Sequence, residues 1–366
     1  MEEYEGYCTD VLFEEAMRFI REKKDRPFFC YLSTNAPHGP LNVPVEYVEL
    51  YRDMEKVPER QKRFYGMISN IDDNFKRLES QLEELGLTEN TLLIFMTDNG
   101  TALGHVVYDA GLRGNKGSEY EGGHRVPFMM RWPSGKIGGG RKVEQLSAHY
   151  DVLPTLVDLL DLDFTPGKTL DGTSLKPLLY GKTNNWPGRI LYMDTQRVQN
   201  LVKYKQYSVM DEEWRLVNGD ELYHMETDLG QDSNVFEQHP EVAASLAEAY
   251  ERWWKSILDE GVEERYAYIK AGSSHENPVR ITSHDMFSER MGNCWHQYGA
   301  VMATEAQGIW KVEIVEEGDY SISLRRFPRE SGWGFNASFP AATEAIRLER
   351  SMPASKQVGF VEASLY

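Results

Sequence analysis

Hydrophobic residues in the first hundred positions follow two different spacings. In residues 9–24 they recur every three or four positions, and residues 58–85 keep the same spacing up to Gly86. Each stretch predicts a helix with one apolar face. The apolar runs at residues 28–32 and 92–96 are short and continuous instead. Runs of that kind predict strands that are buried on both faces, as in the middle of a parallel sheet.

The order of these elements predicts an α/β fold. A strand, a loop, a long helix and a second strand follow one another, which suits neighbouring parallel strands. Residues 126–132 add a further expected strand, and residues 152–160 a short helix. We therefore expect residues 1–185 to form an α/β domain in which a mostly parallel sheet is flanked by helices.

The pattern changes in the middle of the chain. Short strand-like runs at residues 190–193, 201–209 and 214–217 predict a small antiparallel sheet, and residues 240–258 return to helical spacing. We assign residues 186–265 to this sheet and its helix.

Two later segments complete the pattern. Residues 221–230 are rich in turn-forming residues and predict a turn. Residues 310–315 and 320–325 alternate apolar and polar positions about an acidic turn that contains Gly318, which predicts a hairpin. We assign residues 270–366 to a β-rich C-terminal appendage.

Composition and charge narrow the class of protein. The chain has 366 residues, of which 41% are hydrophobic, so it can bury a sizeable core. No stretch approaches the ~20 apolar residues of a membrane span, and we expect no membrane insertion. A formal net charge of −18 argues against a role at nucleic acid or at a membrane surface. Three cysteines are too few for a disulfide framework or a zinc site.

Candidate chemistry begins directly after the expected strand at residues 92–96. Asp98 and Asn99 follow it, and Gly100 lets the backbone turn away. A carboxylate and an amide side by side are oxygen ligands that a hard divalent cation accepts. In open α/β sheets ligands bind beyond the carboxyl ends of the strands. The alternative is a plain turn, since Asp-Asn-Gly is common turn chemistry.

Two more polar loops are expected at the same edge of the sheet. One follows residues 28–32 and contains His38. The other is the glycine-rich segment at residues 101–125, which contains Lys116. Long loops inside a compact domain are usually functional. A loop histidine or a basic glycine-rich loop taken alone is more often a surface feature, so the combination carries the argument.

This combination resembles the sulfatase family, whose fold is the alkaline phosphatase-like α/β fold. The likeness covers roughly residues 7–260, and residues 271–366 resemble a β-rich appendage of some bacterial members. The motifs that carry the resemblance are Asn35-Ala-Pro-His38-Gly-Pro, Thr97-Asp98-Asn99-Gly100, Leu112-Arg-Gly-Asn-Lys116-Gly-Ser-Glu-Tyr-Glu-Gly-Gly-His-Arg-Val-Pro127 and Glu221-Leu-Tyr-His-Met.

The resemblance implies a role for each motif. Asp98 and Asn99 become metal ligands, for Ca²⁺ in preference to Mg²⁺, and a bound cation polarises a sulfuryl oxygen. His38 and Lys116 become catalytic and substrate-binding residues that contact the sulfate group. Lys116 supplies positive charge where the transferring group gathers negative charge, and His38 can donate a proton to the leaving oxygen. Arg113, Glu121 and Arg125 are interpreted as structural residues that tie the loop down.

One part of the family pattern is absent from this chain. Sulfatases use a formylglycine made from Cys or Ser in a Cys/Ser-x-Pro-x-Arg motif, and none of Cys8, Cys30 and Cys294 begins that motif. Residues 351–355 (Ser-Met-Pro-Ala-Ser) contain the proline but lack the arginine. The family's other metal-binding aspartates also have no match. We therefore expect a sulfatase fragment that holds about half of an active site and is inactive as given.

The function that follows is hydrolysis of sulfate esters by the complete protein, with a small-molecule or glycan sulfate ester as substrate. One alternative is a phosphoester or phosphonate hydrolase of the same superfamily, and another is a non-catalytic protein that binds sulfated glycans. A periplasmic or secreted location is expected for a full-length family member. The particular ester, the compartment and the oligomeric state are not determined by the sequence.

Overall fold

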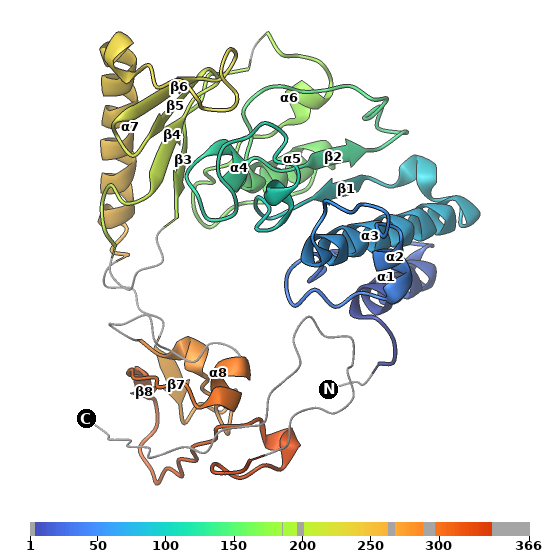
Figure 1. Ribbon diagram of the computed structural model, residues 1–366, viewed down its shortest axis with the longest axis vertical. Coiled ribbons are helices and arrows are strands. Elements are labelled where there is room, and N and C mark those ends of the chain that lie inside the picture. Colours follow the sequence, from blue (N-terminus) through green and yellow to red (C-terminus); the bar gives the residue numbers. More distant parts are fainter. Residues whose placement is uncertain (1–3, 185, 196–200, 263–267, 288–296, 339–366) are drawn as a thin grey trace. The chain divides into compact units, whose positions relative to one another are not determined.

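The computed structural model describes residues 4–184, 186–195, 201–262, 268–287 and 297–338 (Figure 1). The chain divides into two compact units. The first holds residues 1–196 and 202–256, and the second holds residues 197–201 and 257–366. The predicted boundary near residue 186 lies inside the first unit, and the three-part division stays a prediction.

Two long helices build one side of the first unit. The helix α1 (Cys8–Lys23) packs against α3 (Glu59–Glu84), as the apolar spacing predicts, and α2 (Val45–Glu49) also packs on α3. Gly86 follows α3 at φ +68°, a left-handed conformation that glycine adopts without strain. The cluster between α1 and α3 consists of Phe13, Met17, Ile20, Leu78 and Leu82.

Strands β1 (Leu93–Met96) and β2 (Phe128–Arg131) pair antiparallel, with Leu93 opposite Arg131. All four residues of β1 are half-buried, so the expectation of burial on both faces is wrong. Residues 28–32 form no assigned strand, and their Phe29 and Tyr31 side chains are 75% and 80% exposed.

The α/β class holds, but the described residues of the first unit contain no parallel strand pair. The prediction of a mostly parallel sheet is therefore wrong for this part of the chain. An apolar run indicates a strand, whereas the partner of that strand depends on the path of the intervening chain. Here the segment between β1 and β2 returns β2 in the opposite direction.

The small antiparallel sheet is present and has one strand more than expected. Its order is β3 (Leu191–Asp194), β4 (Tyr207–Met210), β5 (Trp214–Val217) and β6 (Glu221–His224). Each strand pairs antiparallel with the next. The segment expected as a turn begins with β6, because its turn-forming residues lie after His224.

Both faces of this sheet are covered (Figure 1). The helix α7 (Pro240–Asp259) packs on one face, where Leu246 and Tyr250 join Val209 and Leu222 in one core cluster. On the other face Val217, Tyr223 and Met225 cluster with Tyr120 from the loop that follows β1. Every residue of β4 is consequently buried.

The remaining helices of the first unit are short. They are α4 (Glu121–His124), α5 (Val152–Leu159) and α6 (Lys176–Leu179). Asp151, fully buried before α5, accepts hydrogen bonds from the backbone N–H groups of Ala148 and Thr173 and from Arg189. The described 3₁₀ turns are Thr88–Asn90, Gly104–Val106, His149–Asp151, Phe236–Gln238, Ser283–Asp285 and Arg329–Ser331.

The second unit contains β7 (Ile269–Ala271), β8 (Val312–Ile314) and α8 (Gln297–Met302). Strand β8 pairs parallel with β7, and residues 320–325 form no strand, so the predicted hairpin is wrong. Alternation identifies a strand without naming its partner. Among the helices of the described ranges, none combines the length and apolar character that a membrane span needs.

Candidate functional site

The first element of the candidate site is the turn that follows β1. Thr97 continues the pairing with the β2 side, since its N–H donates to the Pro127 carbonyl at 3.4 Å. Asp98 is exposed and Asn99 is half-buried. The Asn99 amide donates to the Asp98 carboxylate at 2.7 Å, so the two side chains lie together as the sequence predicts.

This turn is in direct contact with the glycine-rich loop. The Gly100 N–H donates to the Gly123 carbonyl at 2.9 Å. A β-carbon on Gly100 would lie 1.9 Å from the Gly122 carbonyl oxygen, so only glycine permits this approach. The Lys116 N–H donates to the Thr101 carbonyl at 3.0 Å. Backbone hydrogen bonds therefore join the Asp98 turn (residues 97–101) and the Lys116 loop (residues 112–125) at two places.

Lys116 itself lies at the centre of a compact turn. The Ser118 N–H donates to the Asn115 carbonyl at 2.9 Å, and the Asn115 N–H donates to the Ser118 hydroxyl at 3.2 Å. The Lys116 side chain is half-buried and forms no hydrogen bond or ion pair with any residue in the described part of the chain. An ammonium group in that state is available to an anion.

His38 occupies a separate loop. Its N–H donates to the Asn35 carbonyl at 2.8 Å, and its exposed ring lies with Nδ1 2.8 Å from the Gly39 carbonyl. The loop is anchored by buried Ala36, which shares a cluster with Leu103 beside the Lys116 loop. Within the described residues, no contact joins the His38 ring to Asp98 or Lys116. The structure thus joins two of the three predicted motifs directly.

The far side of the Lys116 loop is fixed to the small sheet by a buried carboxylate. Glu121 Oε1 accepts from Arg215 Nε of β5 at 2.6 Å, with the two side chains 3% and 6% exposed. His124 and Arg125 contact the same carboxylate at 3.3 and 3.1 Å. Burial alone raises the pKa of Glu121, but the His124 hydrogen bond and the Arg215 charge outweigh it and hold that pKa well below its usual value.

A second tie runs through Arg113. Its guanidinium lies 4.0 Å from the centre of the Tyr120 ring and donates to the Tyr223 hydroxyl at 2.7 Å and to the Gln231 carbonyl at 3.1 Å. The Tyr120 hydroxyl donates to Glu221 at 2.8 Å. Burial, followed by this bond to Glu221, raises the pKa of Tyr120 to about 12. These contacts confirm the interpretation of Arg113 and Glu121 as residues that hold the loop.

Two histidines beside the site were not predicted. His149 lies with Nε2 2.8 Å from the Thr97 carbonyl, and His105 Nε2 lies 3.1 Å from the Asn115 amide. Each adjoins one of the two joined motifs. Neither belongs to a motif or to a periodic pattern, so the sequence offered no signal for them.

Asp98 and Asn99 offer ligand atoms of the type that a hard divalent cation binds, but only some of the number that it needs. Asp98 supplies carboxylate oxygens and Asn99 an amide oxygen, the ligand types that Ca²⁺ takes. Ca²⁺ binds about six to eight oxygens, more than these two side chains offer. Among the residues that the structure describes, no group of three or more His, Cys, Asp or Glu side chains is arranged to hold a metal ion.

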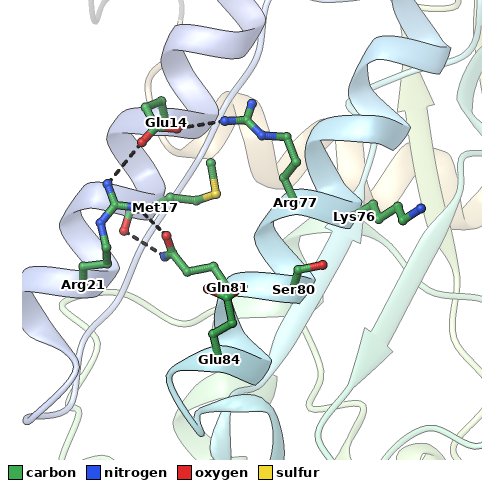
Figure 2. Close-up of a pocket in the computed structure, with 8 residues that line it drawn as sticks. All are labelled: Glu14, Met17, Arg21, Lys76, Arg77, Ser80, Gln81 and Glu84. Carbon is green, nitrogen blue, oxygen red and sulfur yellow. Dashed lines mark hydrogen bonds and ion pairs between the residues drawn. The ribbon is translucent and has the colours of Figure 1, made fainter.

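A groove between α1 and α3 is lined by residues of these two helices, and none of them belongs to the His38, Asp98 or Lys116 motifs (Figure 2). Glu14 accepts from Arg21 at 3.1 Å and from Arg77 at 2.9 Å, and Gln81 donates to the Met17 carbonyl at 2.9 Å. These polar side chains satisfy one another across the helix pair. The groove is therefore a packing seam, and it gives no competing candidate site.

Comparison with known proteins bears on the whole of this arrangement. A family model described as Sulfatase matches residues 1–162, and one described as N-sulphoglucosamine sulphohydrolase, C-terminal, matches residues 114–255. The two matches overlap on the Lys116 loop.

Individual relatives agree with the family models. The uncharacterized sulfatase YdeN of Escherichia coli (strain K12) is 32% identical over 51% of this chain and 33% of its own length. N-acetylgalactosamine-6-sulfatase of Canis lupus familiaris is 30% identical over 63% of this chain and 43% of its own length. The chain thus spans less than half the length of these two curated relatives.

A solved structure extends the likeness to the fold. Ps i-CgsB, crystallised in complex with k-i-k-neocarrahexaose, superposes with a TM-score of 0.62 at 27% identity, covering 69% of this chain and 56% of that one. The sequence motifs, the two family matches and this superposition agree: residues 1–162 match the sulfatase family, residues 114–255 match the sulphohydrolase C-terminal model, and this part of the chain has the alkaline phosphatase-like fold of sulfatases.

Proposed function

We propose that the complete protein to which this chain corresponds is a sulfuric ester hydrolase. The observation that carries the proposal is the pair of backbone hydrogen bonds that joins the Asp98 turn to the Lys116 loop, at Gly100–Gly123 and Lys116–Thr101. They hold two oxygen ligands and a free ammonium group in neighbouring segments, which is the combination that binding and polarising a sulfate group requires.

In this proposal the residues divide the work by charge. Lys116 binds a sulfuryl oxygen and offsets the negative charge that grows during transfer. His38 donates a proton to the leaving oxygen. Asp98 and Asn99 hold a divalent cation, Ca²⁺ in preference to Mg²⁺, as two of its ligands. When bound there, that cation acts as a Lewis acid on the sulfate group.

The nucleophile is the part of the chemistry that this sequence lacks. The family resemblance implies formylglycine, and no Cys/Ser-x-Pro-x-Arg motif occurs among the 366 residues. Cys8 and Cys30 are free thiols outside such a motif. We therefore assign binding and proton transfer to this chain, and no nucleophilic role to any of its residues.

A sulfated glycan is the substrate class that the relatives support. One relative is named N-acetylgalactosamine-6-sulfatase, and the superposed Ps i-CgsB was crystallised in complex with k-i-k-neocarrahexaose. A net charge of −18 disfavours nucleic acid as a partner. An extracytoplasmic location, periplasmic or secreted, belongs to the same proposal.

The experiment titrates this chain with inorganic sulfate and, separately, with inorganic phosphate, and measures binding by isothermal titration calorimetry. We expect saturable sulfate binding that Lys116→Ala abolishes and that Lys142→Ala, which removes an exposed lysine elsewhere, leaves unchanged. Equal sulfate affinity in Lys116→Ala and the unmodified chain would contradict the proposal. Binding of phosphate in strong preference to sulfate would favour the phosphoester alternative.

A further inference from the structure

The Lys116 loop meets the small sheet through contacts that the proposed chemistry does not use. Three acidic or basic side chains of the loop reach the sheet: Arg113 three positions before Lys116, Glu119 three after and Glu121 five after. Their partners come from β5, β6 and the connections around them. Two of the three carboxylate and guanidinium groups, those of Glu119 and Glu121, belong to buried residues.

The contact between Glu121 and Arg215 is the most buried of these. Arg215 points from β5 toward the loop and also donates through Nη1 to the carbonyls of Asp211 and Trp214. Its guanidinium is therefore fixed to the backbone at both ends of the β4–β5 turn before it reaches Glu121. The Glu121 N–H is held in turn by the Gln231 side chain at 2.8 Å. Arg215 is thus held at the β4–β5 turn, and Glu121 is held by Gln231 from the segment that follows β6.

The position of Glu121 is transmitted to the site through a short segment of backbone. Glu121 begins α4, and the next two residues are Gly122 and Gly123. Gly123 accepts the hydrogen bond from Gly100, and the Gly122 N–H donates to the Arg113 carbonyl at 2.8 Å. A shift of Glu121 would therefore move both the Asp98 turn and the base of the Lys116 loop.

We propose that Arg215 is a positioning residue for the Asp98–Lys116 site, acting through its buried ion pair with Glu121. The inference rests on the proposed function for the meaning of the site, but the contact itself is independent of any chemistry. It assigns the small sheet a direct part in the site: the strand β5 sets where Lys116 lies. Replacing a buried ion pair by apolar residues often leaves the stability of a protein unchanged, so fixing the geometry of the loop is a role that fits the Glu121–Arg215 pair.

The experiment compares Arg215→Met, Arg215→Lys and Glu121→Gln with Leu246→Ala. Leu246 belongs to α7, which packs on the opposite face of the same sheet, so its truncation weakens that packing without touching the loop. Two readouts report on the loop directly. One is amide hydrogen exchange of residues 113–124, and the other is the rate at which acetic anhydride acylates Lys116 relative to Lys142.

We expect Arg215→Met to accelerate exchange of residues 113–124 and to change the relative acylation rate of Lys116, each by about fivefold or more. Arg215→Lys restores the charge but not the fork of donors, so we expect an intermediate effect. Glu121→Gln keeps the side-chain volume and provides the same comparison if Arg215→Met fails to fold. Leu246→Ala should lower the unfolding midpoint and leave both loop readouts unchanged.

The inference is overturned if the loop readouts of the Arg215 and Glu121 variants match those of the unmodified chain. It is equally overturned if Leu246→Ala changes them as much, because the loop would then follow general stability. Sulfate binding is measured separately on the unmodified chain. If sulfate does not bind while Arg215→Met still frees the loop, the proposed function fails and the positioning role of Arg215 stands.

Discussion

The small sheet and the β1–β2 pair differ in how completely they are buried. Every residue of β4 is buried because α7 covers one face and the Lys116 loop the other. All residues of β1 are only half-buried, and the neighbouring residues 28–32 expose Phe29 and Tyr31. Each strand of the small sheet pairs with the next strand in the sequence, so the pairing does not depend on residues far away along the chain. The candidate site lies between the two regions and takes its ligands from the less buried one.

The side-chain contacts of the candidate site come largely from the more buried of these two regions. Asp98 and Lys116 lie on the chain between β1 and β2. The side chains of Arg113 and Glu121, in the Lys116 loop, bond to residues of the small sheet. In many proteins loops carry the functional residues and a rigid scaffold positions them. Here the scaffold for Lys116 is the antiparallel sheet.

The largest expected effect concerns turnover. We expect no hydrolysis of an aryl sulfate by this chain in the presence of Ca²⁺, because removal of a covalent nucleophile costs about 10⁶-fold in rate in well-studied hydrolases. The assay compares the chain with Lys116→Ala, and the two should be equally inactive. Metal-dependent turnover that Lys116→Ala abolishes would refute this expectation and require a nucleophile within the chain.

Core substitutions should separate the two regions by stability. Leu222 of β6 is fully buried against α7. Leu222→Ala should lower the free energy of unfolding by about 2–5 kcal/mol, because the substitution leaves a cavity. Met129 of β2 is 57% exposed, and Met129→Ala should change stability by no more than about 0.5 kcal/mol. Urea unfolding of both variants measures the contrast. Similar losses would mean that the two regions are equally well packed.

The close approach at Gly100 gives a smaller, more local effect. Gly100→Ala places a β-carbon against the Gly122 carbonyl, and relieving that overlap should cost about 1–3 kcal/mol. At Gly167 an added β-carbon would meet no atom within 4 Å, so Gly167→Ala should change stability by at most about 1 kcal/mol. Thermal or urea unfolding provides the measurement. A neutral Gly100→Ala variant would show that the two loops are not in contact.

The smallest expected effect is a dependence on acid. Because the folded-state pKa of Glu121 lies below its ordinary value of about 4.3, the unfolded chain binds the proton more readily. The carboxylate therefore stabilises the fold above that pH, and the contribution is lost as pH falls toward the folded-state pKa.

The free energy of unfolding of the unmodified chain should fall between pH 5 and pH 3. In Glu121→Gln this fall should be smaller by about 1–2 kcal/mol, because the variant lacks the carboxyl that titrates. Urea unfolding at several pH values measures this loss. Glu83→Gln, on the exposed side of α3, serves as the control. An acid dependence that is the same in Glu121→Gln and the unmodified chain would contradict the low pKa of this carboxyl.

Much of the fold could be predicted because its signals are local. Helices α1, α3 and α7 follow from apolar spacing, and β3, β4 and β5 from short runs. The antiparallel pairing of β1 with β2 could not be predicted, because an apolar run indicates a strand but does not specify its partner. The same limit explains the parallel pairing of β7 with β8.

The site shows the same division between local and remote signals. Asp98 and Lys116 were predicted to lie together from their places beside strand-like runs, and backbone hydrogen bonds join their segments. Glu121 and Arg215 are separated by 94 positions, and no periodicity relates them. An arginine inside the short apolar strand β5 was the one signal in the sequence, because a buried charge needs a partner. His149 beside Thr97 had none.

The central claim is that Asp98 and Lys116 serve one site, and the affinity for sulfate measured with and without Ca²⁺ tests it most directly. Concentrations are kept below those at which calcium sulfate precipitates. Two ligands of one site are coupled reciprocally, so we predict that Ca²⁺ strengthens sulfate binding by about fivefold or more and that Asp98→Asn removes this gain. Sulfate affinity that is the same with and without Ca²⁺ in the unmodified chain would contradict the claim.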